Sequence, residues 1–216
     1  MADDPIPLRP KVARLCTELS LLHPEIPEAR KSTLHQLADY VQARRAKQEA
    51  SRVNFICTHN SRRSHLAQLW LGIAADYYGI PDVQTFSGGT EATALSPQAV
   101  AALQRAGLKI VGRTAWEKNP LYHVNWRDSG PPTALFSKIY DEAPNPKRDF
   151  AAVLVCESAA EDCPFVPGAN PRIVLPYEDP KWSDGTPEEE EAYDETLQEI
   201  GRDMLYVMAR VADSER

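Results

Sequence analysis

The sequence has no long apolar run and no excess of positive charge. None of its segments approaches the roughly eighteen continuous apolar residues that span a bilayer, and its first residues, Met-Ala-Asp-Asp, lack the basic and apolar regions of a secretory signal. With 24 lysines and arginines against 31 aspartates and glutamates, the formal net charge is −7. Such a charge repels nucleic acid and anionic lipid surfaces. We therefore expect a cytoplasmic protein that binds neither nucleic acid nor membrane.

Cysteine is also scarce. Four cysteines in 216 residues do not form the dense disulfide framework of a small secreted protein, so catalysis, metal binding or burial must account for each thiol. The length and the 43% hydrophobic content suffice for one α/β core with additional structure. Two large domains are not expected.

Residues 1–52 are predicted to form a helical arm. Apolar residues recur at helical spacing over 12–22 and again over 34–41, with a proline-containing breaker between the two runs. The basic run that follows, 42–49, is interpreted as a solvated helix face. An arm of this kind usually caps a domain or provides an oligomer contact, so a homo-oligomer formed through the arm is one expectation.

From residue 53 to residue 216, short β-like runs alternate with helical stretches, which predicts one α/β domain with a parallel sheet and right-handed crossovers. The predicted strands are 53–56, 83–86, 151–156 and 172–175. Three helices are predicted in this part. The first covers about 64–78, the second begins at Ser96-Pro97 and stops at Gly107, and the third begins at the capping-box pattern Thr186-Pro-Glu-Glu189. The stretch 113–149 follows neither period and is predicted to be an insertion, with a hairpin near 122–140.

The junction between the first of these strands and the helix after it reads Cys57-Thr-His-Asn-Ser-Arg-Arg-Ser64. A loop at such a junction can turn its N–H groups inward, and the first N–H groups of the helix have no intrahelical partners, so the loop forms a cup for an oxyanion. The same field favours a thiolate at Cys57. Arg63 can bind two oxygens of a tetrahedral anion, Ser64 can donate to the sulfur, and Asn60 can hold the loop backbone.

The alternative is a buried cysteine that ends a strand and precedes a basic loop. At average residue usage, Asn, Arg and Ser at the third, sixth and seventh places after a cysteine occur by chance on the order of once in a thousand trials. The strand-loop-helix context agrees with the catalytic interpretation, which we therefore prefer.

With its preceding strand, this loop resembles the phosphate-binding loop of the low-molecular-weight protein tyrosine phosphatases and of the thioredoxin-coupled arsenate reductases that share their fold. The resemblance covers about 53–111 and 150–210, and includes Phe86-Ser-Gly-Gly-Thr-Glu91 and Asp179-Pro180. It implies a four-stranded parallel sheet with helices on both faces and Asp179 as general acid. It also implies that the oxyanion-binding residues are Thr58, His59, Asn60, Ser61, Arg62, Arg63 and Ser64.

Two further cysteines distinguish the two activities. The segment from Cys156 to Cys163-Pro164 resembles the redox segment of the reductases, with the same seven-residue step. The resemblance implies that Cys57 attacks arsenate, that Cys156 displaces arsenite by forming a disulfide with Cys57, and that Cys163 takes over this disulfide and presents it to thioredoxin. Burial in the core is the alternative for Cys156, and Cys16 is expected to pack on a helix face.

The sequence departs from the family pattern at several positions. His59 stands where glycine is usual and where positive φ can be required, and Arg62 stands where a second cysteine is common. Gln68 replaces a glutamate through which some reductases bind potassium, so no metal is included in the predicted site. Trp182 is either a wall for an aromatic substrate or a packing residue. A zinc site formed by Cys57, His59, Cys156 and Cys163 is a further alternative, but the spacing of these residues matches no usual zinc motif.

We therefore predict an arsenate reductase that needs no cofactor and uses thioredoxin or a similar thiol donor. The first alternative is a phosphatase for phosphotyrosine or aryl phosphates, which forms a phosphocysteine. The second is an oxyanion sensor without catalytic activity.

Overall fold

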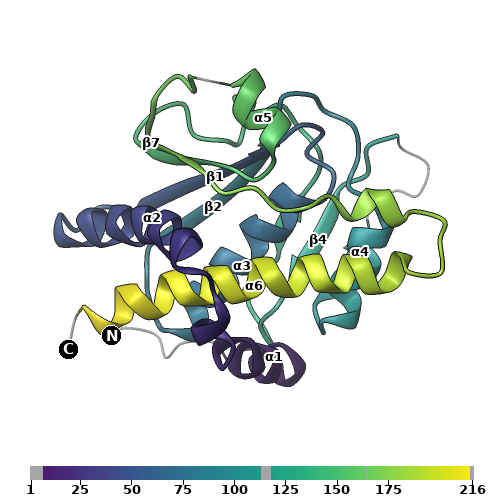
Figure 1. Ribbon diagram of the computed structural model, residues 1–216, viewed down its shortest axis with the longest axis horizontal. Coiled ribbons are helices and arrows are strands. Elements are labelled where there is room, and N and C mark those ends of the chain that lie inside the picture. Colours follow the sequence, from purple (N-terminus) through teal and green to yellow (C-terminus); the bar gives the residue numbers. More distant parts are fainter. Residues whose placement is uncertain (1–6, 113–117, 164, 215–216) are drawn as a thin grey trace.

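The computed structural model describes residues 7–112, 118–163 and 165–214. Its central sheet contains four parallel strands in the order β2-β1-β6-β7 (Figure 1). These strands are β1 (Ser51–Cys57), β2 (Val83–Gly89), β6 (Phe150–Leu154) and β7 (Ala169–Val174). The predicted α/β class and the four-stranded parallel sheet are confirmed, although β6 ends two residues earlier than the apolar run indicated.

Two long helices cover one face of the sheet. In α3 (Arg63–Tyr77), every residue from Ser64 to Ala75 is buried, because this helix is apolar on all sides and lies between β1, β2 and α6. Helix α6 (Glu189–Asp213) packs against α3 through its one apolar face. The predicted capping box does not form, because the Thr186 hydroxyl accepts from the amide of Glu188 instead of Glu189 and the helix begins only at Glu189.

A short helix, α5 (Glu157–Asp162), lies on the other face. The side chain of Arg172 extends from β7 on that face and donates to the carbonyls of Ala160 at 2.7 Å and Cys163 at 2.9 Å. Helices therefore lie on both faces, as the resemblance implied. Helix α4 (Pro97–Arg105) packs beside α6 and begins at the predicted N-cap, since Ser96 Oγ accepts from the amide of Ala99.

The N-terminal segment consists of α1 (Pro10–Ser20), the 3₁₀ turn η1 (His23–Glu25) and α2 (Glu28–Ala46). Figure 1 shows α2 running alongside α6, and both α1 and α2 pack against that helix. The apolar residues of α2, which include Leu34 and Leu37, are fully buried in the same core as the sheet. The apolar face of α2 is thus buried against α6, β1 and β7, and an oligomer contact through the arm stays a prediction.

The described part of the insertion, with the strand that precedes it, forms a small antiparallel sheet in the order β3-β4-β5. Its strands are β3 (Lys109–Gly112), β4 (Tyr122–Asn125) and β5 (Thr133–Leu135), so the predicted hairpin is present. Asp76 at the end of α3 holds this sheet by accepting from Trp126 Nε1 and Arg127 Nε, each at 2.6 Å. The segment after β5 then crosses Gly88, where an added Cβ would lie 2.3 Å from the Cα of Tyr140.

A histidine is buried in this core. His65 on α3 has its Nδ1 3.0 Å from the Ser87 hydroxyl on β2. Burial lowers the pKa of His65 to about 3, and the charge of Lys138 acts in the same direction, whereas a hydrogen bond with the backbone of Asn60 opposes both. His65 is therefore neutral in the folded protein at pH values where the unfolded chain protonates it.

We predict that His65→Gln weakens the acid sensitivity of the fold. The unfolded chain binds a proton near pH 6.5 and the folded chain only near pH 3, so His65 lowers the free energy of unfolding by about 1.4 kcal/mol per pH unit as the pH falls through this interval. Urea unfolding between about pH 7 and about pH 5 measures this slope. The control is His123→Gln on β4, and an equal slope in wild type and His65→Gln would contradict the assignment.

Candidate active site

The predicted site residues meet at the carboxyl ends of the parallel strands. Cys57 is the last residue of β1, Cys156 follows β6 by two residues, and Asp179 follows β7 by five. Because these three strands are adjacent, their C-terminal loops converge on the same edge of the sheet, where ligands of open α/β folds usually bind.

The loop between β1 and α3 has its carbonyl groups turned outward. The carbonyl of Thr58 accepts from the amide of Glu91 at 2.8 Å, that of His59 from the hydroxyls of Thr93 and Ser137, and that of Ser61 from the amide of Ser96. Within the described chain, none of the amides of 58–62 donates to another protein group. These amides, together with the first amides of α3, remain available for an anion.

Cys57 lies beneath this loop and is only 3% exposed. Its side chain is hydrogen-bonded. Its Sγ is 3.1 Å from Ser64 Oγ, which accepts from Asn60 Nδ2 at 2.8 Å. Because the Ser64 hydroxyl already accepts from an amide, its own proton is free to be donated to the sulfur, as expected from the sequence.

Asn60 differs from its predicted role. Its Oδ1 accepts from the backbone amide of Lys138 at 2.9 Å, so Asn60 ties the loop to the insertion instead of bonding to the loop's own backbone. The positive φ of the loop, 45°, also occurs at Asn60. The expectation of positive φ at His59 is therefore wrong, and asparagine tolerates this conformation better than most residues.

Gly89 and the insertion support the loop, and sequence reasoning did not include them among the site residues. A Cβ at Gly89 would lie 2.6 Å from the Thr58 oxygen and 2.7 Å from the Asn60 nitrogen, so the loop packs directly on this glycine. The glycine pair at the end of β2, in the segment Phe86-Ser-Gly-Gly-Thr-Glu91, was the available signal. No sequence pattern identified Ser137 and Lys138.

Arg63 is held beside the predicted acid. Its guanidinium donates to Asp179 Oδ2 at 2.5 Å and to the carbonyl of Tyr177 at 2.9 Å. Asp179 also accepts from the amide of Lys181 and thereby caps the 3₁₀ turn η2 (Pro180–Ser183). The carboxylate therefore takes up the hydrogen bonds that Arg63 would offer to a tetrahedral anion.

Arg62 and His59 are less central. Arg62 Nε donates to the hydroxyl of Tyr193 on α6 at 3.0 Å, and its guanidinium lies 3.7 Å from Asp179, so it adds positive charge from the side of the site. His59 Nε2 lies 3.8 Å from a carboxylate oxygen of Glu91 at the rim.

The second cysteine lies beside the loop. Cys156 Sγ is 3.6 Å from the hydroxyl of Thr58, the residue after Cys57, and it also accepts from the amide of Ala159 as the N-cap of α5. Cys163 follows α5, and burial, with a smaller effect of Asp162, raises the pKa of its thiol. All four cysteines are free thiols and buried, and Cys16 packs in the core as predicted.

A pocket of about 580 Å³ opens above these groups. Its walls come from the loop after Cys57, the start of α5 and the segment 176–182, which includes Trp182, a residue that is 79% exposed. Cys57, Asn60 and Ser64 do not line it. The lining residues include Thr58, His59, Arg63, Cys156, Asp179 and Lys181.

The described residues contain no group of three or more His, Cys, Asp or Glu side chains placed to hold a metal ion. Gln68 donates from Nε2 to the carbonyl of Thr85, and its Oε1 is buried without a hydrogen-bond partner in the described part of the chain. Lys138 brings a buried positive charge to the same region, where burial lowers its pKa to about 8. No helix of the described chain has the length and hydropathy needed to cross a bilayer.

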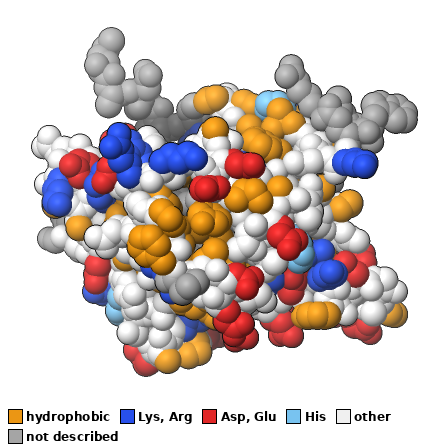
Figure 2. All heavy atoms as spheres, turned by 90° about the horizontal axis from the view of Figure 1, so that it is seen from above, with side chains coloured by type: hydrophobic (Ala, Val, Ile, Leu, Met, Phe, Trp, Pro, Cys, Tyr) orange, Lys and Arg blue, Asp and Glu red, His pale blue; other side chains and the backbone are white. Residues whose placement is uncertain are grey.

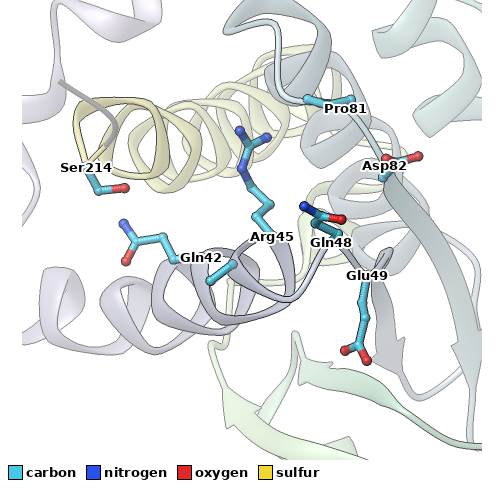
Figure 3. A pocket seen from close by; sticks show the side chains of 8 residues that line it. Gln42, Arg45, Gln48, Glu49, Pro81, Asp82 and Ser214 are labelled. Carbon is cyan, nitrogen blue, oxygen red and sulfur yellow. The ribbon is translucent and has the colours of Figure 1, made fainter.

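A second pocket, of about 530 Å³, lies at the amino ends of the strands (Figure 3). Gln42 and Arg45 extend into it from α2, and Pro81 and Asp82 lie on its other side before β2. None of the predicted site residues lines it.

Comparison with known proteins gives relatives in sequence and in fold. Over 150 residues, which are 69% of this chain and 88% of the relative, the chain is 31% identical to an arsenate reductase of Bacillus subtilis (strain 168). Primo-1, a solved structure, superposes with a TM-score of 0.51 at 15% identity over 74% of this chain and 97% of the other. A low-molecular-weight protein tyrosine phosphatase from T. tengcongensis gives a TM-score of 0.48 at 17% identity, with 76% and 99% covered. No family model matches the chain.

We predict that Gly89→Ala disrupts the anion cup. The new Cβ would come within 2.7 Å of backbone atoms of the loop, which must shift and misalign its amides. We expect inorganic phosphate to bind at least about tenfold more weakly, a loss of about 1.4 kcal/mol, as measured by calorimetry. The control is Gly112→Ala, whose Cβ would meet a Tyr122 ring carbon at 3.3 Å far from the loop. Equal phosphate affinity in both variants would contradict the packing argument.

Proposed function

Because the chain belongs to the arsenate reductase family, we propose that it reduces arsenate through Cys57, Cys156 and Cys163, with a thioredoxin-like dithiol as reductant. The observation that supports this most is the second thiol beside the loop, since Cys156 Sγ lies 3.6 Å from Thr58 Oγ1. A phosphatase has no need of a thiol there.

In the first step, the inward amides and Arg63 bind arsenate and the Cys57 thiolate attacks arsenic. A sulfur–arsenic bond forms and an arsenic–oxygen bond breaks. The bound anion takes over the guanidinium that pairs with Asp179. The carboxylate then accepts a proton from the bound dihydrogen arsenate and gives it to the departing hydroxyl oxygen, so that water leaves.

In the second step, the Cys156 thiolate attacks the Cys57 sulfur. A Cys57–Cys156 disulfide forms, the electron pair of the sulfur–arsenic bond goes to arsenic, and arsenite leaves as the reduced product. The two thiols supply the two electrons. Thr58 directly follows Cys57 in the chain, and its hydroxyl contacts Cys156. A small movement of the start of α5 toward the loop therefore brings the two sulfurs together for this attack.

In the third step, Cys163 attacks Cys156, and the Cys57 thiolate is released. This exchange requires α5 to open, because Cys163 is buried behind this helix of six residues. The sulfur of Cys156 caps α5 through the amide of Ala159 at 3.4 Å, and forming the disulfide with Cys57 removes that cap. A helix this short is not stable without its cap and packing.

The Cys156–Cys163 disulfide is then reduced by an external dithiol. Figure 2 views the face on which α5 and β7 lie and shows hydrophobic side chains gathered on it. Phe165, two residues after Cys163, is 73% exposed. An exposed aromatic ring beside the terminal thiol favours contact with a protein reductant. A relay of this type requires a reducing compartment, which agrees with the expected cytoplasmic location.

One observation favours the phosphatase as second candidate. Trp182 stands exposed at the pocket, three residues after Asp179, where its ring can stack on the ring of an aryl phosphate. The two candidates are separated by measuring arsenite formation with thioredoxin and hydrolysis of p-nitrophenyl phosphate on the same sample. Arsenite formation without the hydrolysis supports the reductase, and the reverse overturns it. Phosphate binding with neither activity indicates an oxyanion sensor.

We predict that Cys163→Ser abolishes multiple-turnover arsenate reduction while any hydrolysis of aryl phosphate is retained. One arsenite per protein is still released, and mass spectrometry then detects a Cys57–Cys156 disulfide, because only the last exchange is blocked. Cys16→Ala, at a buried cysteine away from the site, is the control. Equal loss of both activities in Cys163→Ser, or continued turnover, would refute the relay.

A further inference from the structure

We propose that the N-terminal arm positions the acid of the active site through Arg30, which clamps the segment 176–179 to α6. This inference rests on the proposed function insofar as Asp179 is the acid, and it assigns a role in the reaction to α2. Arg30 lies in the first turns of α2, 146 residues before the segment that it contacts.

Arg30 makes several contacts at once. Its NH1 donates to the carbonyl of Pro176 at 3.2 Å, its Nε donates to Asp203 Oδ2 on α6 at 2.6 Å, and its guanidinium carbon stands 4.4 Å from the centre of the Tyr177 ring. Glu199 adds a more distant ion pair at 3.5 Å. A planar guanidinium can make a fork and a stacking contact together, which an ammonium cannot.

Tyr177 transmits this clamp to the site. Its hydroxyl donates to Asp203 Oδ2 at 3.1 Å, its ring lies under Arg30, and its carbonyl accepts from Arg63 NH1 at 2.9 Å. One residue thus contacts the arm, α6 and the arginine of the loop. Asp179 follows it by only two residues, so a displacement of Tyr177 moves the carboxyl group.

The clamp is buried, which makes it rigid. Asp203 is completely buried and is compensated by Arg30, Arg202 and the Tyr177 hydroxyl. Toward the sheet, the chain leading into the segment 176–179 is held by two backbone hydrogen bonds. The amide of Leu175 donates to the carbonyl of Leu154, and the amide of Tyr177 donates to that of Val155. These two bonds fix where the segment starts. Arg30 fixes the side of Tyr177 that faces α6, and therefore the direction in which the chain continues to Asp179.

The test compares Arg30→Met with a matched variant, Arg44→Met. Both arginines lie on α2 with side chains 19% and 21% exposed, but Arg44 pairs with Glu49 and does not touch the segment. The measurements are peptide-level hydrogen exchange of residues 175–183, kcat for arsenate with thioredoxin, and the dissociation constant of inorganic phosphate. Because Arg202 still accompanies Asp203 in Arg30→Met, the variant is expected to fold.

We expect Arg30→Met to increase exchange in 175–183 and to lower kcat by about tenfold to a hundredfold, the scale of a misplacement of roughly 1 Å. Phosphate affinity should change less than about threefold, since the amides of the loop are untouched. Arg30→Lys restores the ion pair with Asp203 and the melting temperature but not kcat. Arg44→Met should resemble wild type in all three measurements.

The other outcomes are also decisive. Unchanged exchange, unchanged kcat, or full recovery of kcat in Arg30→Lys overturns the proposal. If Arg30→Met increases hydrogen exchange in 175–183 but the wild-type protein turns over neither arsenate nor aryl phosphate, the clamp stands and the proposed function is refuted. If Arg30→Met does not fold, Tyr177→Phe, which removes only the hydroxyl on Asp203, must show the same pattern at smaller size, and wild-type exchange in this variant counts against the clamp.

Discussion

The direction of the peptide groups in 58–62 is the constraint on which the site depends. A loop of this length offers its amides to an anion only if its carbonyls find partners on the outside. Those partners come from three separate places: the end of β2, the insertion at Ser137, and the amide of Ser96 before α4. The insertion, which lies outside the resemblance to the phosphatases, is therefore part of the scaffold of the loop.

The charge distribution agrees with this local design. A protein with a formal net charge of −7 repels anions at long range, so a site for a dianion must rely on fixed groups at short range. Arg62 and Arg63 both face Asp179 in the free site. This carboxylate balances two guanidiniums that would otherwise stand uncompensated below the surface.

The sheet, the loop at Cys57 and the common edge at which Asp179 and the cysteines lie could be predicted from the sequence, because each depends on neighbouring residues: apolar alternation, a strand-to-helix junction, and short motifs after strands. The roles of Asp179, Cys156 and Cys163 stay predictions. The features that were missed depend on contacts between distant parts of the chain. Lys138 reaches Asn60 across 78 residues, and Arg30 reaches Pro176 across 146. The capping box at Thr186 failed for a local reason instead, since its hydroxyl bonds to Ser183 and Glu188 before the helix begins at Glu189.

Burial of the thiols provides an order for the proposed relay. Burial raises the pKa of Cys163, and Asp162 adds to this, so this thiol is protonated and a poor nucleophile while α5 is closed. Arg172 holds the closed state through the carbonyls of Ala160 and Cys163. In the proposed relay, Cys156 leaves its capping position to bond Cys57, and α5 loses support at its start. Cys163 then gains solvent, ionises more readily and attacks, so the proposed relay activates the last thiol only after the first disulfide exists.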